Sequence, residues 1–107
     1  MEHEVFDLQS QKFVKANGYE DYNRLIDAEY GTTITAHREG DTIFTYWVDE
    51  EALCHDNPEM NWAVSAHVGY PVFGKAIVTA YSAELGEDVC LSNHRDLVLE
   101  LFGDMEI

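Results

Sequence analysis

Residues 57–83 form a stretch of the chain that is almost free of charge. Glu59 and Lys75 are its only acidic or basic residues, and Ala, Val, Ile, Tyr and Phe are frequent in it. The segments on either side are acidic, because 28–56 and 84–107 each hold seven acids and one Lys or Arg. Charged side chains are almost never fully buried unless they are paired. We therefore expect the neutral stretch to supply the core and the acidic segments to wrap it.

The acidic excess restricts the partners that the protein can bind. The 107 residues include 21 Asp and Glu against 6 Lys and Arg, for a formal net charge of −15. Affinity for nucleic acid and for anionic membrane surfaces comes mainly from Lys and Arg, so we expect neither partner. A basic protein is the natural complement of such a surface.

Length and composition predict a single domain over residues 1–107. Hydrophobic residues make up 46% of the chain, which is too many for a disordered acidic tail. The apolar runs are too short to span a membrane, and the acidic start of the chain is unlike a targeting segment. With only two cysteines, Cys54 and Cys90, a disulfide-stapled secreted fold is not expected. We expect a cytoplasmic protein, in the host cytoplasm if a phage encodes it.

Periodicity and capping residues predict four helices. They are expected at residues 5–16, at 19–30, at 58–68 after an Asn57 N-cap, and in a last helix capped by Ser92 or Asn93. For the first of them, an extended conformation near Val5 is the alternative. The stripe predicted to be buried on the third helix is Trp62, Ala63, Ala66 and His67.

Strands are predicted at 32–37, 42–49, 74–82 and 88–91, where β-branched and aromatic residues are frequent. Both faces of the strand 42–49 carry bulky side chains, so we expect this strand to be central or covered on each side. The fold class is α+β: a small, mostly antiparallel sheet of about four strands, with two to four helices packed on one side.

The segment 61–92 carries a family resemblance. It holds Asn61-x-Ala63, a helix end at Gly69, Pro71-Val72-Phe73-Gly74 leading into the strand GKAIVTAY at 74–81, and GEDVCLS at 86–92. Upstream lie Leu25-Ile26, Tyr30-Gly31 and VDEE at 48–51. This pattern resembles an uncharacterised domain family of small proteins that phages, plasmids and conjugative elements carry. The resemblance covers residues 22–92, with the Asn–Ala spacing one residue off. It implies a mobile-element setting, where small acidic proteins counter host defence, and it supplies no catalytic residues.

Acidic side chains are the main candidates for binding. On the last helix they recur every four residues, about 6 Å apart, a spacing that we compare with phosphates along a nucleic-acid strand. An aromatic residue among the acids, Trp47, is a candidate anchor if it projects from an uncovered face. The candidate partner-binding residues are Glu39, Asp41, Trp47, Asp49, Glu50, Glu51, Asp96, Glu100 and Asp104. The alternatives are a solvated face that keeps the protein in solution, adaptation to salt, and, for Trp47, burial under a helix.

Signals for catalysis and metal binding are weak. Cys54-His55 and Cys90-x-x-x-His94 match no established zinc spacing. No serine lies in a nucleophile elbow, and the seven glycines stand singly instead of forming a phosphate loop. We therefore expect no enzyme activity, no metal and no cofactor.

These observations favour an inhibitor that binds a basic, nucleic-acid-binding host protein, of restriction or CRISPR type, by presenting carboxylates in place of phosphates. One alternative is a small-molecule or nucleotide sponge whose phosphate pocket uses Arg38, Arg95 or Lys75. Another is a generic acidic adaptor. A homodimer formed through the sheet face around Trp47 is a further expectation.

Overall fold

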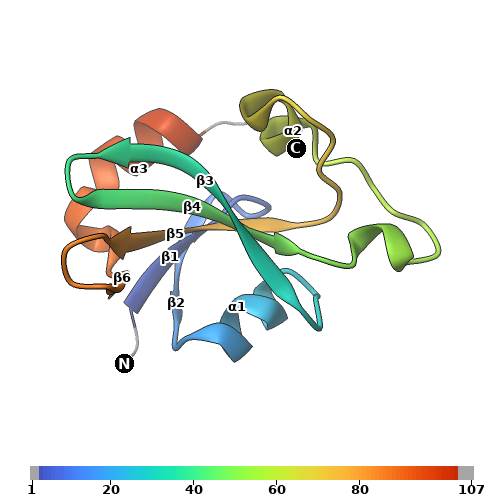
Figure 1. The fold of residues 1–107 in the computed structure, drawn as a ribbon, viewed down its shortest axis with the longest axis horizontal. Coiled ribbons are helices and arrows are strands. Elements are labelled where there is room, and N and C mark those ends of the chain that lie inside the picture. The colour runs from blue at the N-terminus through green and yellow to red at the C-terminus, as the bar shows by residue number, and fades with distance from the viewer. Residues whose placement is uncertain (1–2, 104–107) are drawn as a thin grey trace.

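A single antiparallel sheet organises the molecule (Figure 1). The computed structural model describes residues 3–103. The sheet has six strands in the order β2-β1-β5-β4-β3, with the short β6 paired to the free half of β5. The strands are β1 (His3–Asp7), β2 (Lys12–Ala16), β3 (Gly31–Glu39), β4 (Thr42–Asp49), β5 (Ala76–Ser82) and β6 (Glu87–Val89).

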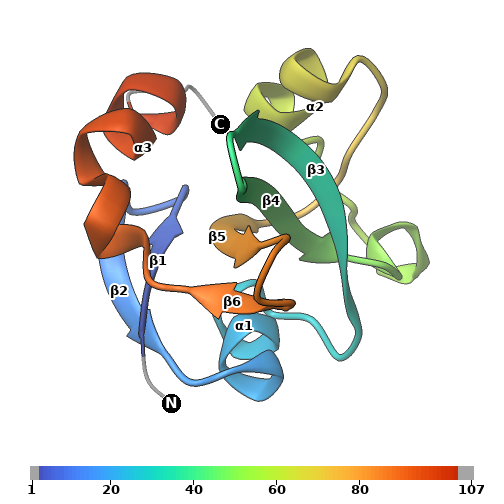
Figure 2. The same cartoon turned by 60° about the vertical axis from the view of Figure 1, so that its left-hand side comes forward.

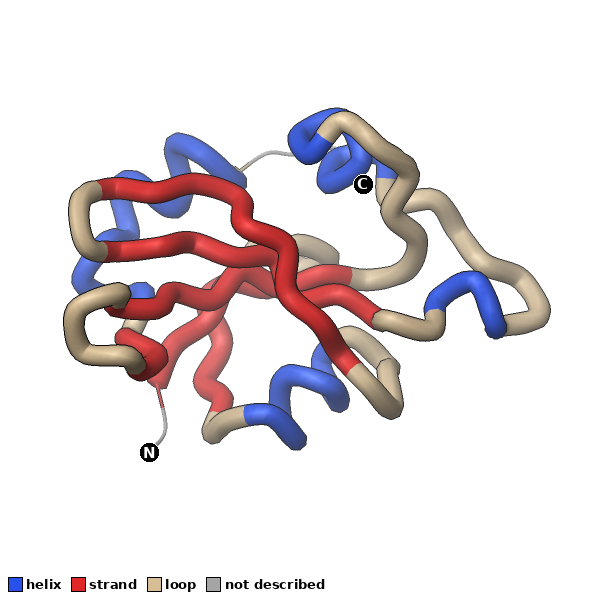
Figure 3. The backbone as a smooth tube through the Cα atoms, in the orientation of Figure 1, coloured by secondary structure: helices blue, strands red, loops and turns tan. Residues whose placement is uncertain are grey.

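Three α-helices and two 3₁₀ turns complete the described part of the chain (Figure 3). None of the helices within residues 3–103 is long and apolar enough to cross a lipid bilayer. The predicted α+β class is confirmed, although the sheet has six strands where about four were expected. The helical segments are α1 (Tyr19–Leu25), η1 (Ala52–Cys54), α2 (Trp62–Val68), η2 (Leu91–His94) and α3 (Arg95–Phe102).

The two additional strands replace the helix predicted for 5–16, which is wrong. Asp7 builds a turn at this point: its carboxylate accepts hydrogen bonds from Gln9 and Ser10, and its carbonyl accepts one from the backbone N–H of Gln11. The chain therefore reverses and forms the β1–β2 hairpin. This turn contains no Gly or Pro, so it lacks the usual sequence signal for a hairpin.

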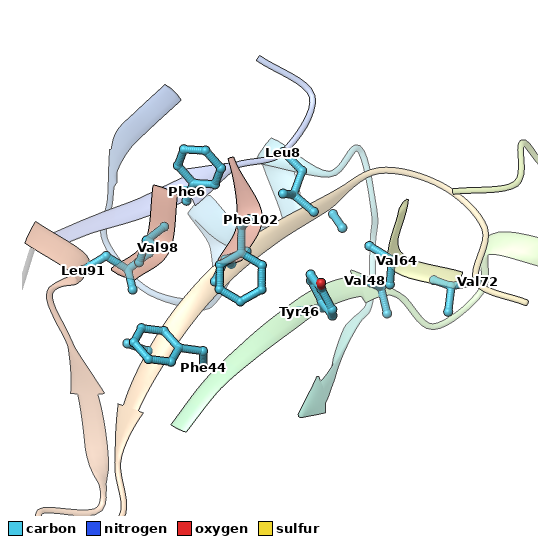
Figure 4. Packing of buried hydrophobic residues seen from close by; sticks show 13 residues of the cluster. Phe6, Leu8, Phe44, Tyr46, Val48, Val64, Val72, Leu91, Val98 and Phe102 are labelled. Carbon is cyan, nitrogen blue, oxygen red and sulfur yellow. The ribbon is translucent and has the colours of Figure 1, made fainter. Parts of the chain in front are cut away.

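Both faces of the sheet are covered: α2 and α3 pack on one side, within the predicted two to four helices, and α1 packs on the other. On the first face, Phe44 and Tyr46 of β4 pack against Phe102 of α3, with α2 beside them (Figure 4). On the second face, Ile77 of β5 packs against Tyr22 of α1. Figure 2 shows α2 and α3 on one side of the strands and α1 on the other. Cover is needed on both faces because the side chains of β5 are buried on both faces of the sheet, except at Tyr81.

The hairpin of β3 and β4 confirms the strands predicted at 32–37 and 42–49, and β4 is an interior strand as expected. β5 and β6 lie at the positions predicted for the last two strands, with shorter bounds.

Helix boundaries differ from the predictions because other groups cap the ends. The N-cap of α2 is Asn61, whose side chain accepts from the backbone N–H of Val64, and not Asn57. The predicted buried stripe is correspondingly wrong at Trp62, which is 67% exposed, and at Ala66 and His67, which are also exposed. Only Ala63 of that stripe is buried. The last helix follows the 3₁₀ turn η2, and the cap predicted at Ser92 or Asn93 is absent, because the N-cap of α3 is His94.

The helix predicted for 19–30 stops early, since α1 ends at Leu25. Asp27 adopts a left-handed backbone conformation with φ 55°, which a helix cannot contain. The backbone N–H of Ala28 then bonds back to the carbonyl of Asn23.

Candidate functional site

Two neighbouring turns bring acidic residues together at one end of the sheet, on the left in Figure 1. Asp41, in the β3–β4 turn, joins them. Its carboxylate accepts hydrogen bonds from the Ser82 hydroxyl at 2.6 Å and from the backbone N–H of Glu84 at 2.7 Å. Its carbonyl accepts from the backbone N–H of Ala83. The β3–β4 and β5–β6 turns are therefore held side by side.

We call this cluster the acidic end and define it by its carboxylates: Glu39, Asp41, Glu84, Glu87 and Asp88. All five residues are exposed. The only Lys or Arg in the two turns is Arg38, whose Nε–H donates to the carbonyl of Gly40. His37 lies 3.0 Å from a carboxylate oxygen of Glu39. The potential at this end is therefore strongly negative.

The second group of candidate acids lies at the opposite end of β4. Asp41 and Asp49 are separated by the length of that strand, about 26 Å at about 3.3 Å per residue. Asp49 is only 6% exposed and serves the fold, because its carboxylate bonds to His55 Nε2 at 2.7 Å and to the backbone N–H of Glu51. Glu50 and Glu51 are exposed there. The structure thus divides the candidate acids between two ends and does not gather them in one patch.

The acids of the last helix occupy a third position. Asp96 and Glu100 are exposed on α3, which covers the first face of the sheet. The ring of His94, just before α3, lies 5.7 Å from that of Phe44 near the start of β4, so the helix begins close to the acidic end. Asp104 lies outside the described residues.

Trp47 does not project from an uncovered face, which was the condition for its predicted role as an anchor. Its side chain is partly buried under α1, where the indole N–H donates to Asn23 at 2.9 Å. The rings of Tyr19 and Tyr22 pack edge-on against it at 5.4 and 5.3 Å. This is the alternative of burial under a helix, and it removes the apolar face on which the expected homodimer rested.

Beside α1 the second face of the sheet is open and forms a groove of about 370 Å³. Its floor is a row of threonines in register across three strands: Thr35 of β3, Thr45 of β4 and Thr79 of β5. The hydroxyls of Thr45 and Thr79 bond to each other at 2.6 Å. We call this site the threonine groove.

Aromatic residues flank the threonine groove. Trp47 and Tyr22 line it at the α1 side, and Tyr81 and Asp88, which are paired across β5 and β6, line it at the acidic end. Sequence reasoning missed this site, although the alternation of Thr33, Thr35 and Thr45 with bulky residues was a usable signal.

A hydrogen-bond chain fixes Asp88 at the edge of the groove. The Tyr22 hydroxyl donates to Asp88 at 3.0 Å and contacts His3 Nε2 on its other side. Burial, followed by the nearby charge of Asp88, raises the pKa of Tyr22 above its ordinary value. The phenol therefore stays protonated and remains a donor to the carboxylate.

The bases required for a phosphate pocket are dispersed. Lys75 pairs with Asp27, and Arg95 pairs with Glu4 at 2.8 Å while lying over the ring of Phe13. Arg38 lies at the acidic end. The described part of the chain thus holds no site where the three bases named for a nucleotide sponge meet.

Two of the residues considered as metal ligands and judged weak, His55 and Cys90, contact other groups. His55 bonds to Asp49, and the Cys90 thiol contacts Ser92 and the backbone N–H of Glu4. Within residues 3–103, no group of three or more His, Cys, Asp or Glu side chains is arranged to hold a metal ion.

Salt is expected to stabilise the protein. Repulsion within a chain of net charge −15 opposes the compact state, and ions screen it. Raising NaCl from about 0.02 to 0.5 M should raise the Tm by several degrees, since 1 kcal/mol shifts the Tm of such a domain by about 4–8 °C. Differential scanning calorimetry tests this. The triple variant Glu39→Gln, Glu84→Gln, Glu87→Gln should show a smaller dependence, and a Tm that does not respond to NaCl would contradict the expectation.

Comparisons with protein-family models, with curated proteins and with solved structures found nothing that matches this chain. Its function is therefore inferred from its own residues and their geometry.

Proposed function

We propose that the protein is a non-enzymatic inhibitor that binds a basic, nucleic-acid-binding protein through its acidic end, where its carboxylates take the place of phosphates. The observation that carries the proposal is the joining of two turns by Asp41, which holds Glu39, Glu84 and Glu87 at one end of a rigid sheet. Carboxylates carried by two joined turns lose less backbone freedom on binding than carboxylates on a mobile loop.

The charge distribution supports a partner of opposite sign. In the described residues, Lys75 and Arg95 are engaged in ion pairs with Asp27 and Glu4, which are not among the carboxylates of the acidic end. A negative patch steers a positive partner during encounter and rejects nucleic acid. The nucleic-acid-binding surface of a restriction or CRISPR-type protein has the required positive charge. The counter-defence setting is part of the proposal, and its support is the sequence resemblance of residues 22–92 to small mobile-element proteins.

Site-directed charge reversal tests the proposal. The variant Glu39→Lys, Glu84→Lys, Glu87→Lys changes only exposed side chains at the acidic end. The matched control, Glu50→Lys, Glu51→Lys, Glu59→Lys, makes the same change in net charge with exposed residues away from it. Each tagged protein is used to capture partners from nuclease-treated bacterial lysate, and the captured protein is identified, purified and titrated by calorimetry.

We expect the wild type and the control to retain the same basic protein, to release it at moderate salt, and to lose it when DNA is added. The acidic-end variant should bind it roughly 100-fold more weakly, because like charges facing each other cost several kcal/mol. Equal affinity of the two variants, or retention that neither salt nor DNA reduces, would refute the proposal.

A further inference from the structure

The threonine groove opens directly beside the acidic end. Tyr81 and Asp88 form its boundary on that side, and the next residues along the two strands are Ser82 and Glu87. A partner that lies over the acidic end therefore also reaches the mouth of the groove. On the first face of the sheet, Phe44 near this end packs against Phe102 of α3.

The charges around the threonine groove favour a positively charged ligand. Among the described residues that line it, none is Lys or Arg, and the single charged group is the carboxylate of Asp88. The Tyr22 hydroxyl holds that carboxylate in place. An anionic ligand would meet both Asp88 and the field of the whole chain, with a net charge of −15, so charge complementarity favours a positive occupant.

The uncharged walls suit a long side chain with a cationic tip. Tyr81 and Trp47 line the groove, and aromatic side chains are suitable neighbours for an alkyl stem and a planar cation. The hydroxyls of Thr45 and Thr79 bond to each other through one proton, so their remaining lone pairs are free to accept further donors. Arginine matches this combination best, because its guanidinium is planar, stacks on aromatic rings and carries five N–H donors.

We infer that the threonine groove receives one arginine side chain of the basic partner, with the guanidinium beside Asp88 and the stem over the threonine row. This inference rests on the proposed function for the identity of the partner, and it adds the residue type that the partner inserts. A central, largely enclosed arginine is typical of the residues that dominate protein–protein affinity. The groove would then add specificity to the attraction that the acidic end supplies.

A titration with a defined probe tests the groove by itself. The full chain, with isotope-labelled threonine methyl groups and tryptophan indole, is titrated by NMR with acetyl-Ala-Arg-Ala-amide up to about 20 mM. The neutral analogue with citrulline in place of arginine is the control ligand. We expect saturable shifts at Thr45, Thr79 and the Trp47 indole N–H with the arginine peptide, and shifts at least about tenfold smaller with the citrulline peptide.

Two matched pairs of variants locate the binding. Thr35→Tyr fills the groove from an exposed position without a change in charge, and Thr32→Tyr places the same residue on the other face of β3. Asp88→Asn removes the groove carboxylate, and Glu100→Gln removes one charge from α3. We expect Thr35→Tyr and Asp88→Asn to weaken arginine-peptide binding at least about tenfold, and the two controls to bind as the wild type does.

The results separate this inference from the proposed function. If the captured basic protein is lost on charge reversal at the acidic end but binds Thr35→Tyr normally, the groove inference is overturned and the proposed function stands. If no basic protein depends on the acidic end, the proposed function fails, whatever the groove variants show. Absence of saturable shifts at the groove, or shifts of the same size in Thr35→Tyr and Thr32→Tyr, also overturns the inference.

Discussion

Replacing Phe102 with alanine is expected to lower the free energy of unfolding by about 3–5 kcal/mol, the usual cost of removing a buried aromatic ring. Phe102 is 0% exposed at the end of α3. Its ring lies 6.3 Å from Phe44, 5.6 Å from Tyr46 and 6.3 Å from His67, so it connects the first face of the sheet to two helices. Small domains have a total stability of only about 5–15 kcal/mol, so the loss should be severe.

Leu99→Ala is the matched control, since Leu99 is on the same helix but 48% exposed. Its effect should stay below about 1 kcal/mol. Urea unfolding followed by tryptophan fluorescence measures both variants. Comparable losses for Phe102→Ala and Leu99→Ala would show that α3 does not pack through its Phe102 face.

Gly31→Ala is expected to cost about 2–4 kcal/mol, from about 1–3 kcal/mol of overpacking and about 1 kcal/mol for a lost hydrogen bond. A Cβ at Gly31 would lie 2.0 Å from the indole nitrogen of Trp47 and 2.5 Å from the side-chain oxygen of Asn23. These two atoms form the hydrogen bond that ties α1 to the sheet. The indole would have to move away, and the hydrogen bond would be lost.

The readouts for Gly31→Ala are the urea midpoint and the near-ultraviolet circular dichroism of tryptophan. The exposed neighbour Thr32 supplies the control, because Thr32→Ala changes the same strand without reaching α1 and should lie within about 1 kcal/mol of the wild type. Unchanged stability and spectrum in Gly31→Ala would contradict the close contact. A displaced indole should also weaken arginine-peptide binding, since Trp47 lines the threonine groove.

The middle of the fold could be predicted from the sequence because its signals are local. The alternation of Phe44, Tyr46 and Val48 with Ile43, Thr45 and Trp47 gave both faces of β4 correctly. The hairpin β1–β2 was missed because its turn is stabilised by the carboxylate of Asp7 and contains neither Gly nor Pro, the usual signals of a turn. The face of the sheet on which each helix packs could not be predicted from the sequence either, since it depends on which strands become neighbours.

The candidate site depended even more on contacts between distant residues. Asp41 and Glu84 are 43 residues apart, and only the pairing of β4 with β5 brings them together. Acids close together in the sequence, such as Asp41 and Asp49, were separated by the strand between them. Trp47 illustrates the same difficulty, because a strand residue with a bulky side chain gives no sign of whether a helix covers it.

The strand order has a consequence for the way in which the chain folds. β5 lies between the hairpins β1–β2 and β3–β4 and pairs with a strand of each, yet it follows both in the sequence. During synthesis the two hairpins emerge first, and neither can join the sheet until residue 82 has left the ribosome. Phe44 and Tyr46 wait still longer for their partner Phe102, because residue 102 emerges after β5. Folding is therefore governed by contacts of long sequence separation, and its rate should be slow for a domain of this size and sensitive to substitutions in β5.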